Sequence, residues 1–138
     1  LDSLDVLVLN QSEAAYLGLH LGFDVISPTI VAKRVAANYD LICIVTLGKE
    51  GIVACLPDGV IEMGSLPIDA VDTTAAGDAF VGVLAANLDE GIDLPLALKK
   101  AVVAGGLACL TRGAQVSLPS QQDIEDNLKN LPAPRRSA

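Results

Sequence analysis

Two continuously apolar runs predict buried β-strands in the first third of the chain, over residues 4–10 (LDVLVLN) and 40–48 (DLICIVTLG). Their short length and many Val, Leu and Ile residues are typical of strands in a parallel sheet that is covered on both faces. Between them, Ser27 stands at an N-cap position and Pro28 at the first helical position, which predicts a helix to about Asn38. Strand, helix and strand in this order predict a parallel pair joined by a right-handed crossover.

A short helix and a β-hairpin complete the pattern around these two strands. Ser12 is placed to cap a short helix (EAAYLGL) directly after the first strand. Further along, two short apolar runs flank Pro57-Asp58-Gly59. This spacing predicts a hairpin turn and an antiparallel edge on the sheet.

Three more helices are predicted along the rest of the chain. Two of them cover about residues 78–89 and 93–110. The third follows Ser120, where SQQD has the form of a capping box with Asp in the acidic position. Residues 132–138 (PAPRRSA) are expected to form a flexible tail. The fold class is therefore α/β, and the abrupt start on a strand predicts that the chain is the C-terminal portion of something larger.

Composition narrows the range of partners. The chain has 138 residues, of which 51% are hydrophobic and 19% charged, as expected for a packed globular domain. The net charge of −8, with no basic run before Arg135-Arg136, argues against nucleic acid and against an anionic membrane surface. Cys43, Cys55 and Cys109 lie in apolar runs without CxxC spacing, so we expect buried, reduced thiols in a cytoplasmic protein.

Three polar or glycine-bearing stretches stand where predicted strands end or helices begin. They are residues 10–13 (NQSE), 46–51 (TLGKEG) and 72–78 (DTTAAGD). Open α/β sheets bind ligands at the carboxyl ends of their strands, so these stretches are expected to meet at one site. The sequence contains no GxxxxGKS/T motif, which excludes the phosphate loop of the common NTPases.

The third stretch has the composition of an anion-binding helix start. Ala75, Ala76 and Gly77 lead into a helix, so their N–H groups lack intrahelical partners and can hold an anion. Asp78 lies in the same first turn, where its ionised form is favoured. A carboxylate beside an anion hole is suited to take a proton from a hydroxyl while the hole stabilises developing charge. A plain helix-capping role for Asp78 fits the spacing equally well.

Two adjacent glycines interrupt the helix that is predicted over residues 93–110. Each of Gly105 and Gly106 costs a helix interior about 1 kcal/mol relative to alanine, so both need an explanation. Close approach of a flat ligand such as adenine is one explanation. Tight packing of the helix against the sheet is the other.

Four motifs in order give the chain a resemblance to the ribokinase or PfkB-type family of carbohydrate kinases. DTTAAGDAFVGVL resembles the family signature DTxGAGD or DTxAAGD, and NQSEAAYL resembles its NxxE segment. VTLGKEG is similar to its TxGxxG strand end, and TRGAQVSLP to its GAQxSxP segment. Ala75 and the GAQ segment are closest to ribokinase itself. The resemblance implies a three-layer Rossmann-like fold, in which residues 1–131 would be the nucleotide-binding and catalytic C-terminal part.

The resemblance implies ATP-dependent phosphorylation of a sugar hydroxyl, with ATP, Mg²⁺ and K⁺ as cofactors and a homodimer in the complete enzyme. Asp78 would be the general base, and the anion hole would be formed with it by Ala75, Ala76 and Gly77. Asn10 would face the nucleotide phosphates, and Glu13 would help to organise Mg²⁺ through water. The other residues implied to line the nucleotide site are Thr46, Gly48, Gly51 and Val103. The residues implied to bind the monovalent cation, mostly through backbone oxygens, are Asp72, Thr74, Cys109, Arg112, Gly113 and Ser117.

Two departures from the family pattern keep alternatives open. TRGAQ is one residue shorter than the usual spacing in ribokinase, which bears on the cation site. The family's sugar-binding residues lie upstream of the segment seen here, so the chain alone is expected to be inactive. A kinase for another sugar, a sugar phosphate or a nucleoside fits the same motifs. A non-catalytic nucleotide-binding fragment is the alternative from a different class.

Overall fold

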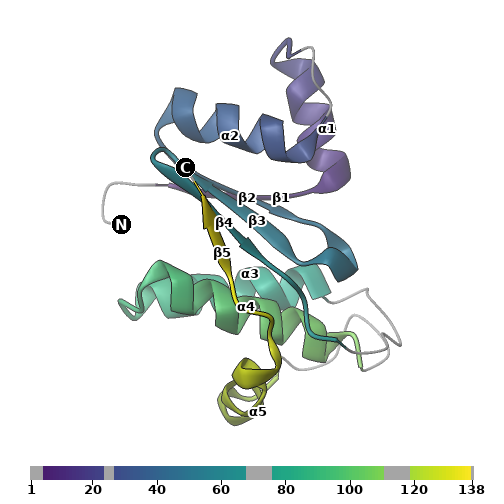
Figure 1. Ribbon diagram of the computed structural model, residues 1–138, viewed down its shortest axis with the longest axis vertical. Helices are drawn as coiled ribbons and strands as arrows, with labels where there is room; N and C mark the ends of the chain where they lie inside the picture. Colours follow the sequence, from purple (N-terminus) through teal and green to yellow (C-terminus); the bar gives the residue numbers. More distant parts are fainter. Residues whose placement is uncertain (1–4, 24–26, 68–75, 111–118, 138) are drawn as a thin grey trace. The chain divides into compact units, whose positions relative to one another are not determined.

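The computed structural model describes residues 5–23, 27–67, 76–110 and 119–137. The chain divides into two compact units. We call Leu1–Met63 with Pro134–Ala138 the sheet unit and Gly64–Ala133 the helical unit. Figure 1 shows the elements in chain order. No helix in the described ranges is long and apolar enough to cross a membrane.

The sheet unit is a five-stranded mixed sheet with the strand order β1-β2-β3-β4-β5. Strands β1 and β2 are parallel, as the sequence predicts, and the other neighbours are antiparallel. Its strands are β1 (Val6–Asn10), β2 (Ile42–Thr46), β3 (Ile52–Leu56), β4 (Gly59–Met63) and β5 (Arg135–Ser137). Its helices are α1 (Gln11–His20) and α2 (Pro28–Tyr39), and a 3₁₀ turn covers Gly48–Glu50.

The bounds of α2 follow from local chemistry. Ser27 has the extended backbone of an N-cap and Pro28 opens the helix, although the Ser27 side chain makes no capping hydrogen bond. The helix ends at Tyr39 because Asp40 adopts the left-handed conformation, with φ of 53°. The predicted end at about Asn38 is confirmed to within one residue.

The prediction that Ser12 caps α1 is wrong. Asn10 is the N-cap residue, and Ser12 lies inside the helix. Asn10 ends β1 and starts α1 at once, because its short carboxamide can accept a hydrogen bond from the first turn. Because the sequence pattern assigned Asn10 to the end of the first strand, it did not predict Asn10 as the N-cap of α1.

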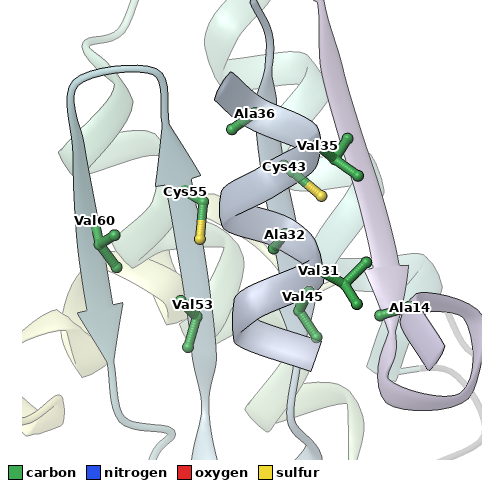
Figure 2. Packing of buried hydrophobic residues seen from close by; sticks show 10 residues of the cluster. All are labelled: Ala14, Val31, Ala32, Val35, Ala36, Cys43, Val45, Val53, Cys55 and Val60. Atoms are coloured by element: carbon green, nitrogen blue, oxygen red, sulfur yellow. The ribbon is translucent and has the colours of Figure 1, made fainter. Parts of the chain in front are cut away.

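A hydrophobic core lies between α2 and one face of the sheet (Figure 2). The side chains alternate along the strands, so every second residue of β2 and β3 reaches this core. Small residues on α2 leave space for the strand side chains. The buried cluster consists of Ala14, Val31, Ala32, Val35, Ala36, Cys43, Val45, Val53, Cys55 and Val60. The intervening residues Ile42, Ile44 and Ala54 are also buried, which explains why the strands read as continuous apolar runs.

The predicted hairpin is confirmed, and it gains an unpredicted neighbour. Leu56 and Gly59 are paired in register across the turn between β3 and β4. The expectation of a flexible tail is wrong for Arg135–Ser137, which pairs with β4 as the edge strand β5. Arg135 Nη2 donates to Glu62 Oε2 at 2.7 Å, an exposed ion pair of the kind that contributes about 0–1 kcal/mol. The polar sequence RRS carries no apolar pattern that would have predicted a strand.

The helical unit contains α3 (Ala76–Asp89), α4 (Leu94–Ala108) and α5 (Gln121–Asn127), with a 3₁₀ turn over Leu128–Asn130. Helix α3 packs along α4, and α4 contacts α5. Gly91, with φ of 82°, ends α3 as expected. Ser120 accepts a hydrogen bond from the N–H of Asp123 at 3.1 Å, so the predicted cap of α5 is confirmed. Lys100 on α4 is buried, and its ammonium lies 4.0 Å from Glu125 on α5.

Candidate functional site

In the sheet unit, the carboxyl ends of β1 and β2 place two of the predicted site residues side by side. Asn10 and Thr46 are partners in the parallel register and are the last residues of their strands. The hydroxyl of Thr46 lies 3.5 Å from the carbonyl oxygen of Leu9, at the outer limit of a hydrogen bond. The predicted meeting of strand ends is therefore confirmed for the stretches at residues 10–13 and 46–51.

Asn10 and Glu13 fix each other in a reciprocal capping box. The N–H of Glu13 donates to Asn10 Oδ1 at 2.8 Å, and the N–H of Asn10 donates to Glu13 Oε1 at 2.9 Å. The carboxamide N–H₂ of Asn10 makes no hydrogen bond to other described residues. Two donors and a carboxylate thus stand at one exposed helix start, which suits a phosphate and a hydrated cation.

The turn between β2 and β3 contains two glycines whose backbone conformation favours glycine. Gly48 has φ of 62° and Gly51 has φ of 98°, a region that L side chains rarely adopt. The N–H of Leu47 donates to the carbonyl of Gly51 at 2.8 Å, which closes the turn. The backbone conformation of this turn therefore explains the presence of glycine at positions 48 and 51 without any ligand. The contact of Gly48 and Gly51 with a nucleotide stays a prediction.

In the helical unit, Ala76, Gly77 and Asp78 form the first turn of α3. The N–H groups of a first turn have no intrahelical acceptors, so they are available to an anion. Gly77 and Asp78 are exposed, and a Cβ built on Gly77 would meet no described atom within 4 Å. Ala75 lies outside the described residues. The first turn of α3 is thus open enough for an anion to reach its backbone.

The two adjacent glycines of α4 are explained by packing within the helical unit. A Cβ on Gly105 would lie 3.2 Å from the carbonyl oxygen of Ala76, and one on Gly106 would lie 2.9 Å from Leu66 Cδ1. Close contact with α3 and with Leu66, both in the same unit, is therefore sufficient to explain both glycines. The sequence pointed to the glycine pair but not to the close approach of Gly105 to the first turn of α3.

The structure describes only two of the other predicted site residues of the helical unit, Val103 and Cys109. Val103 is 0% exposed, so a contact of its side chain with adenine stays a prediction that burial does not favour. Cys109 is buried at the C-cap of α4. The remaining residues of the predicted cation site lie outside the described ranges: Asp72, Thr74, Arg112, Gly113 and Ser117.

The sheet unit has a parallel strand pair with polar residues at its carboxyl ends, as α/β proteins do, and the helical unit has an exposed acidic helix start. The family model described as pfkB family carbohydrate kinase matches residues 1–121. The chain therefore belongs to the pfkB family of carbohydrate kinases, as its motifs predict.

The similar proteins share the fold of this chain, and each of them is more than twice as long as the segment that it matches. The fructokinase of Klebsiella pneumoniae is 37% identical over 130 residues, which cover 90% of this chain and 41% of that protein. The crystal structure of ribokinase from Thermotoga maritima matches 91% of this chain and 42% of its own, with 30% identity and a TM-score of 0.83. Ribokinase from Cryptococcus neoformans var. grubii in complex with ADP matches 89% and 45%, with 26% identity and a TM-score of 0.81. The predicted ribokinase fold is confirmed, and the chain spans less than half the length of these relatives.

Proposed function

We propose that this chain is the nucleotide-binding and catalytic part of an ATP-dependent kinase that phosphorylates a sugar hydroxyl. The first turn of α3 carries this proposal, because it combines N–H groups without intrahelical acceptors, no described atom within 4 Å of a Cβ at Gly77, and the exposed residue Asp78. Membership of the carbohydrate kinase family and the ADP complex of a related ribokinase support ATP as the phosphate donor.

In the proposed reaction, Asp78 takes the proton from the sugar hydroxyl as the oxygen attacks the terminal phosphorus of ATP. The N–H groups of residues 75–78 would hold the charge that develops on the transferring phosphoryl group. Gly105 lets α4 approach this turn closely, because a Cβ there would lie 3.2 Å from the carbonyl oxygen of Ala76. The backbone geometry of the anion hole would thus depend on the packing of α4.

Asn10 and Glu13 would serve the nucleotide end of the reaction. The N–H₂ of Asn10, which has no partner among the described residues, would donate to phosphate oxygens, and the carboxylate of Glu13 would accept from water on Mg²⁺. Mg²⁺ supplies neutralisation of phosphate charge when it is bound. The capping box would hold both side chains ready, because each is already fixed by the other's backbone.

A chimera gives a direct test of this function. In it, the 138-residue chain replaces the segment that it matches in the Thermotoga maritima ribokinase, which is 30% identical. The proposal expects ATP-dependent phosphorylation of ribose by this chimera. A folded chimera that binds ribose but transfers no phosphate would contradict the proposed role of the chain.

Two substitutions of Asn10 separate its structural role from the proposed functional one. Asn10→Ala removes the cap and is expected to lower the free energy of unfolding by about 0.5–2 kcal/mol. Asn10→Asp keeps an acceptor for the N–H of Glu13 but replaces the donor N–H₂ by negative charge. We therefore expect Asn10→Asp to retain the melting temperature and to weaken ADP binding to the chimera by calorimetry. Unchanged ADP affinity in Asn10→Asp would remove Asn10 from the nucleotide site.

A monovalent cation is expected to raise the activity of the chimera. We propose that oxygens of Asp72, Thr74, Cys109, Arg112, Gly113 and Ser117 hold K⁺ behind the anion hole. Turnover should rise when K⁺ replaces a large organic cation at equal ionic strength, and Asp72→Ala should abolish the rise. A flat response of the parent chimera would mean that the TRGAQ segment, one residue shorter than the family spacing, does not form this site.

The proposal also covers the substrate and the assembly of the protein. A fructokinase and two ribokinases among the similar proteins support a sugar, while a sugar phosphate or a nucleoside remains the alternative within the family. We further propose a cytoplasmic homodimer, with no nucleic acid or membrane partner. The free, buried cysteines support the cytoplasmic location, and the net charge of −8 supports the absence of nucleic-acid and anionic-membrane partners. A nucleotide-binding fragment without activity would bind ADP in the chimera yet fail to phosphorylate any of these acceptors.

A further inference from the structure

Cys43 on β2 and Cys55 on β3 form a buried dithiol that has no role in the proposed phosphotransfer. The two residues stand directly opposite each other in the antiparallel register. Both are free and 0% exposed, and Figure 2 shows both side chains on the sheet face that α2 covers. Opposite residues on adjacent strands hold their Cβ atoms roughly 4.5–5.5 Å apart, so the two thiols are close neighbours.

The hydrogen-bond ladder places this pair at a spacing that a disulfide can bridge. The N–H of Leu47 donates to the carbonyl of Gly51, and this pair lies an even number of residues further along the two strands. Because hydrogen-bonded and non-hydrogen-bonded pairs alternate, Cys43 and Cys55 are a hydrogen-bonded pair with Cα atoms about 5.5 Å apart. Disulfides span Cα separations of roughly 4.4–6.8 Å and Cβ separations of roughly 3.5–4.5 Å, so the Cα spacing fits and the two Cβ atoms have to move closer by about 1 Å as the bond closes.

We propose that Cys43 and Cys55 are a modification site, which a low-molecular-weight disulfide oxidises to a cross-strand disulfide when α2 lifts from the sheet. The thiolate of one cysteine attacks a sulfur of glutathione disulfide and releases one glutathione thiolate. The thiolate of the second cysteine then displaces the other glutathione and closes the protein disulfide. The two protons of the protein thiols end on the two glutathione thiols, so the protein is oxidised and glutathione disulfide is reduced.

Helix α2 controls access to the pair. Ala32 and Ala36 belong to the same buried cluster as both cysteines, and Cys55 Sγ lies 4.0 Å from the carbonyl oxygen of Thr29. Burial raises the pKa of Cys43 to about 12, with a further rise from Cys55, and burial raises the pKa of Cys55 to about 11. Because the thiolate is the nucleophile, the closed structure protects both thiols and oxidation has to follow an opening of α2.

The disulfide would close a loop that contains the turn between β2 and β3. Thr46, Gly48 and Gly51, which we propose for the nucleotide site, all lie between Cys43 and Cys55 in the sequence. Oxidation would therefore tie β2 to β3 near the ends of the two strands that lie farthest from this turn. Amide hydrogen exchange over residues 44–54 is expected to slow in the oxidised chain.

The first test is the product of oxidation. The 138-residue chain is incubated with glutathione disulfide and quenched with acid, and intact mass and peptide mapping follow. This readout is covalent, so it does not depend on association state. We expect the loss of two hydrogen atoms and a Cys43–Cys55 peptide, also in Cys109→Ala. Cys43→Ala and Cys55→Ala should give no internal disulfide. A disulfide that includes Cys109, or glutathione adducts alone, would overturn the proposal.

The second test is the role of α2 as the cover. Ala37 on α2 and Ala85 on α3 are both exposed, so Ala→Gly at either position weakens a helix without opening a cavity. Ala37→Gly should speed the appearance of the disulfide by up to about fivefold, whereas Ala85→Gly, on a helix of the other unit, should leave the rate unchanged. Equal rates in both variants would contradict gating by α2.

Discussion

Replacing Asp78 by Asn is expected to lower the turnover of the chimera by roughly 10²–10⁴-fold, the range that a general base contributes. Asn has the size and shape of Asp but cannot accept the proton of the sugar hydroxyl. The backbone N–H groups of the first turn of α3 remain, so the affinity for ADP should stay within a few-fold of the parent. Steady-state kinetics of ribose phosphorylation, with ADP binding by calorimetry, measure both quantities.

Asp89→Asn is the matched control for Asp78→Asn. Asp89 is the last residue of the same helix and is exposed. Its substitution removes the same charge from α3 without touching the first turn. Turnover of Asp89→Asn should equal that of the parent chimera, and both variants should melt as single folded species. Near-normal turnover in Asp78→Asn would exclude Asp78 as the base and would leave it as a helix-capping residue.

The isolated 138-residue chain is expected to show no sugar phosphorylation and to self-associate. It spans less than half the length of the relatives named above, and the family resemblance implies that the sugar-binding residues lie upstream of it. The structure adds a physical reason for association. Strand β1 is at the edge of the described sheet, where unpaired backbone groups can accept another strand.

An apolar groove runs beside this open edge within the sheet unit. It is lined by Leu7, Leu9, Ser12, Glu13, Tyr16 and Leu17. Tyr16 is 73% exposed and Leu19, also on α1, is 65% exposed. Contiguous apolar surface of this kind favours association with a second copy or with the part of the fold that the relatives carry.

Sedimentation of the isolated chain, with and without Leu7→Lys, tests this expectation. A charge in the groove at the β1 edge should shift the chain toward monomer, as edge lysines do in natural sheets. Tyr39→Ser is the control, because Tyr39 is 58% exposed at the end of α2 and does not line the groove. A monomeric parent chain that phosphorylates ribose would show that the 138 residues are sufficient.

The part of the fold that the sequence predicted correctly rests on local chemistry. Pro28 sets the start of α2, Gly91 ends α3 and Ser120 caps α5, each through interactions within a few residues. The apolar runs of β1 and β2 predicted the parallel pair correctly, and β2 is buried as expected, whereas β1 is only partly buried at the edge of the described sheet. The family motifs are local as well, and each one marks a strand end or a helix start.

The wrong predictions, those of a flexible C-terminal tail and of the cap of α1, concern features that depend on where other strands lie or end. Arg135–Ser137 has no strand pattern of its own, and it becomes β5 only because β4 offers a free edge and Glu62 a carboxylate. Asn10 and Glu13 were both predicted as ligand contacts, but their reciprocal hydrogen bonds depend on where β1 stops and α1 begins. Pattern reading placed Ser12 at that boundary because Ser and Asn are similarly good caps.

The sequence by itself determined the family, the α/β class, most of the helix starts and the candidate residues Asn10 and Asp78. Only the tertiary structure decided that Gly105 lies close to the carbonyl of Ala76 and that Cys43 faces Cys55. Propensities and caps act between near neighbours in the chain, so they can be read from a sequence. Strand register and close helix contact join residues that are distant along the chain, and their positions follow from how the whole core packs.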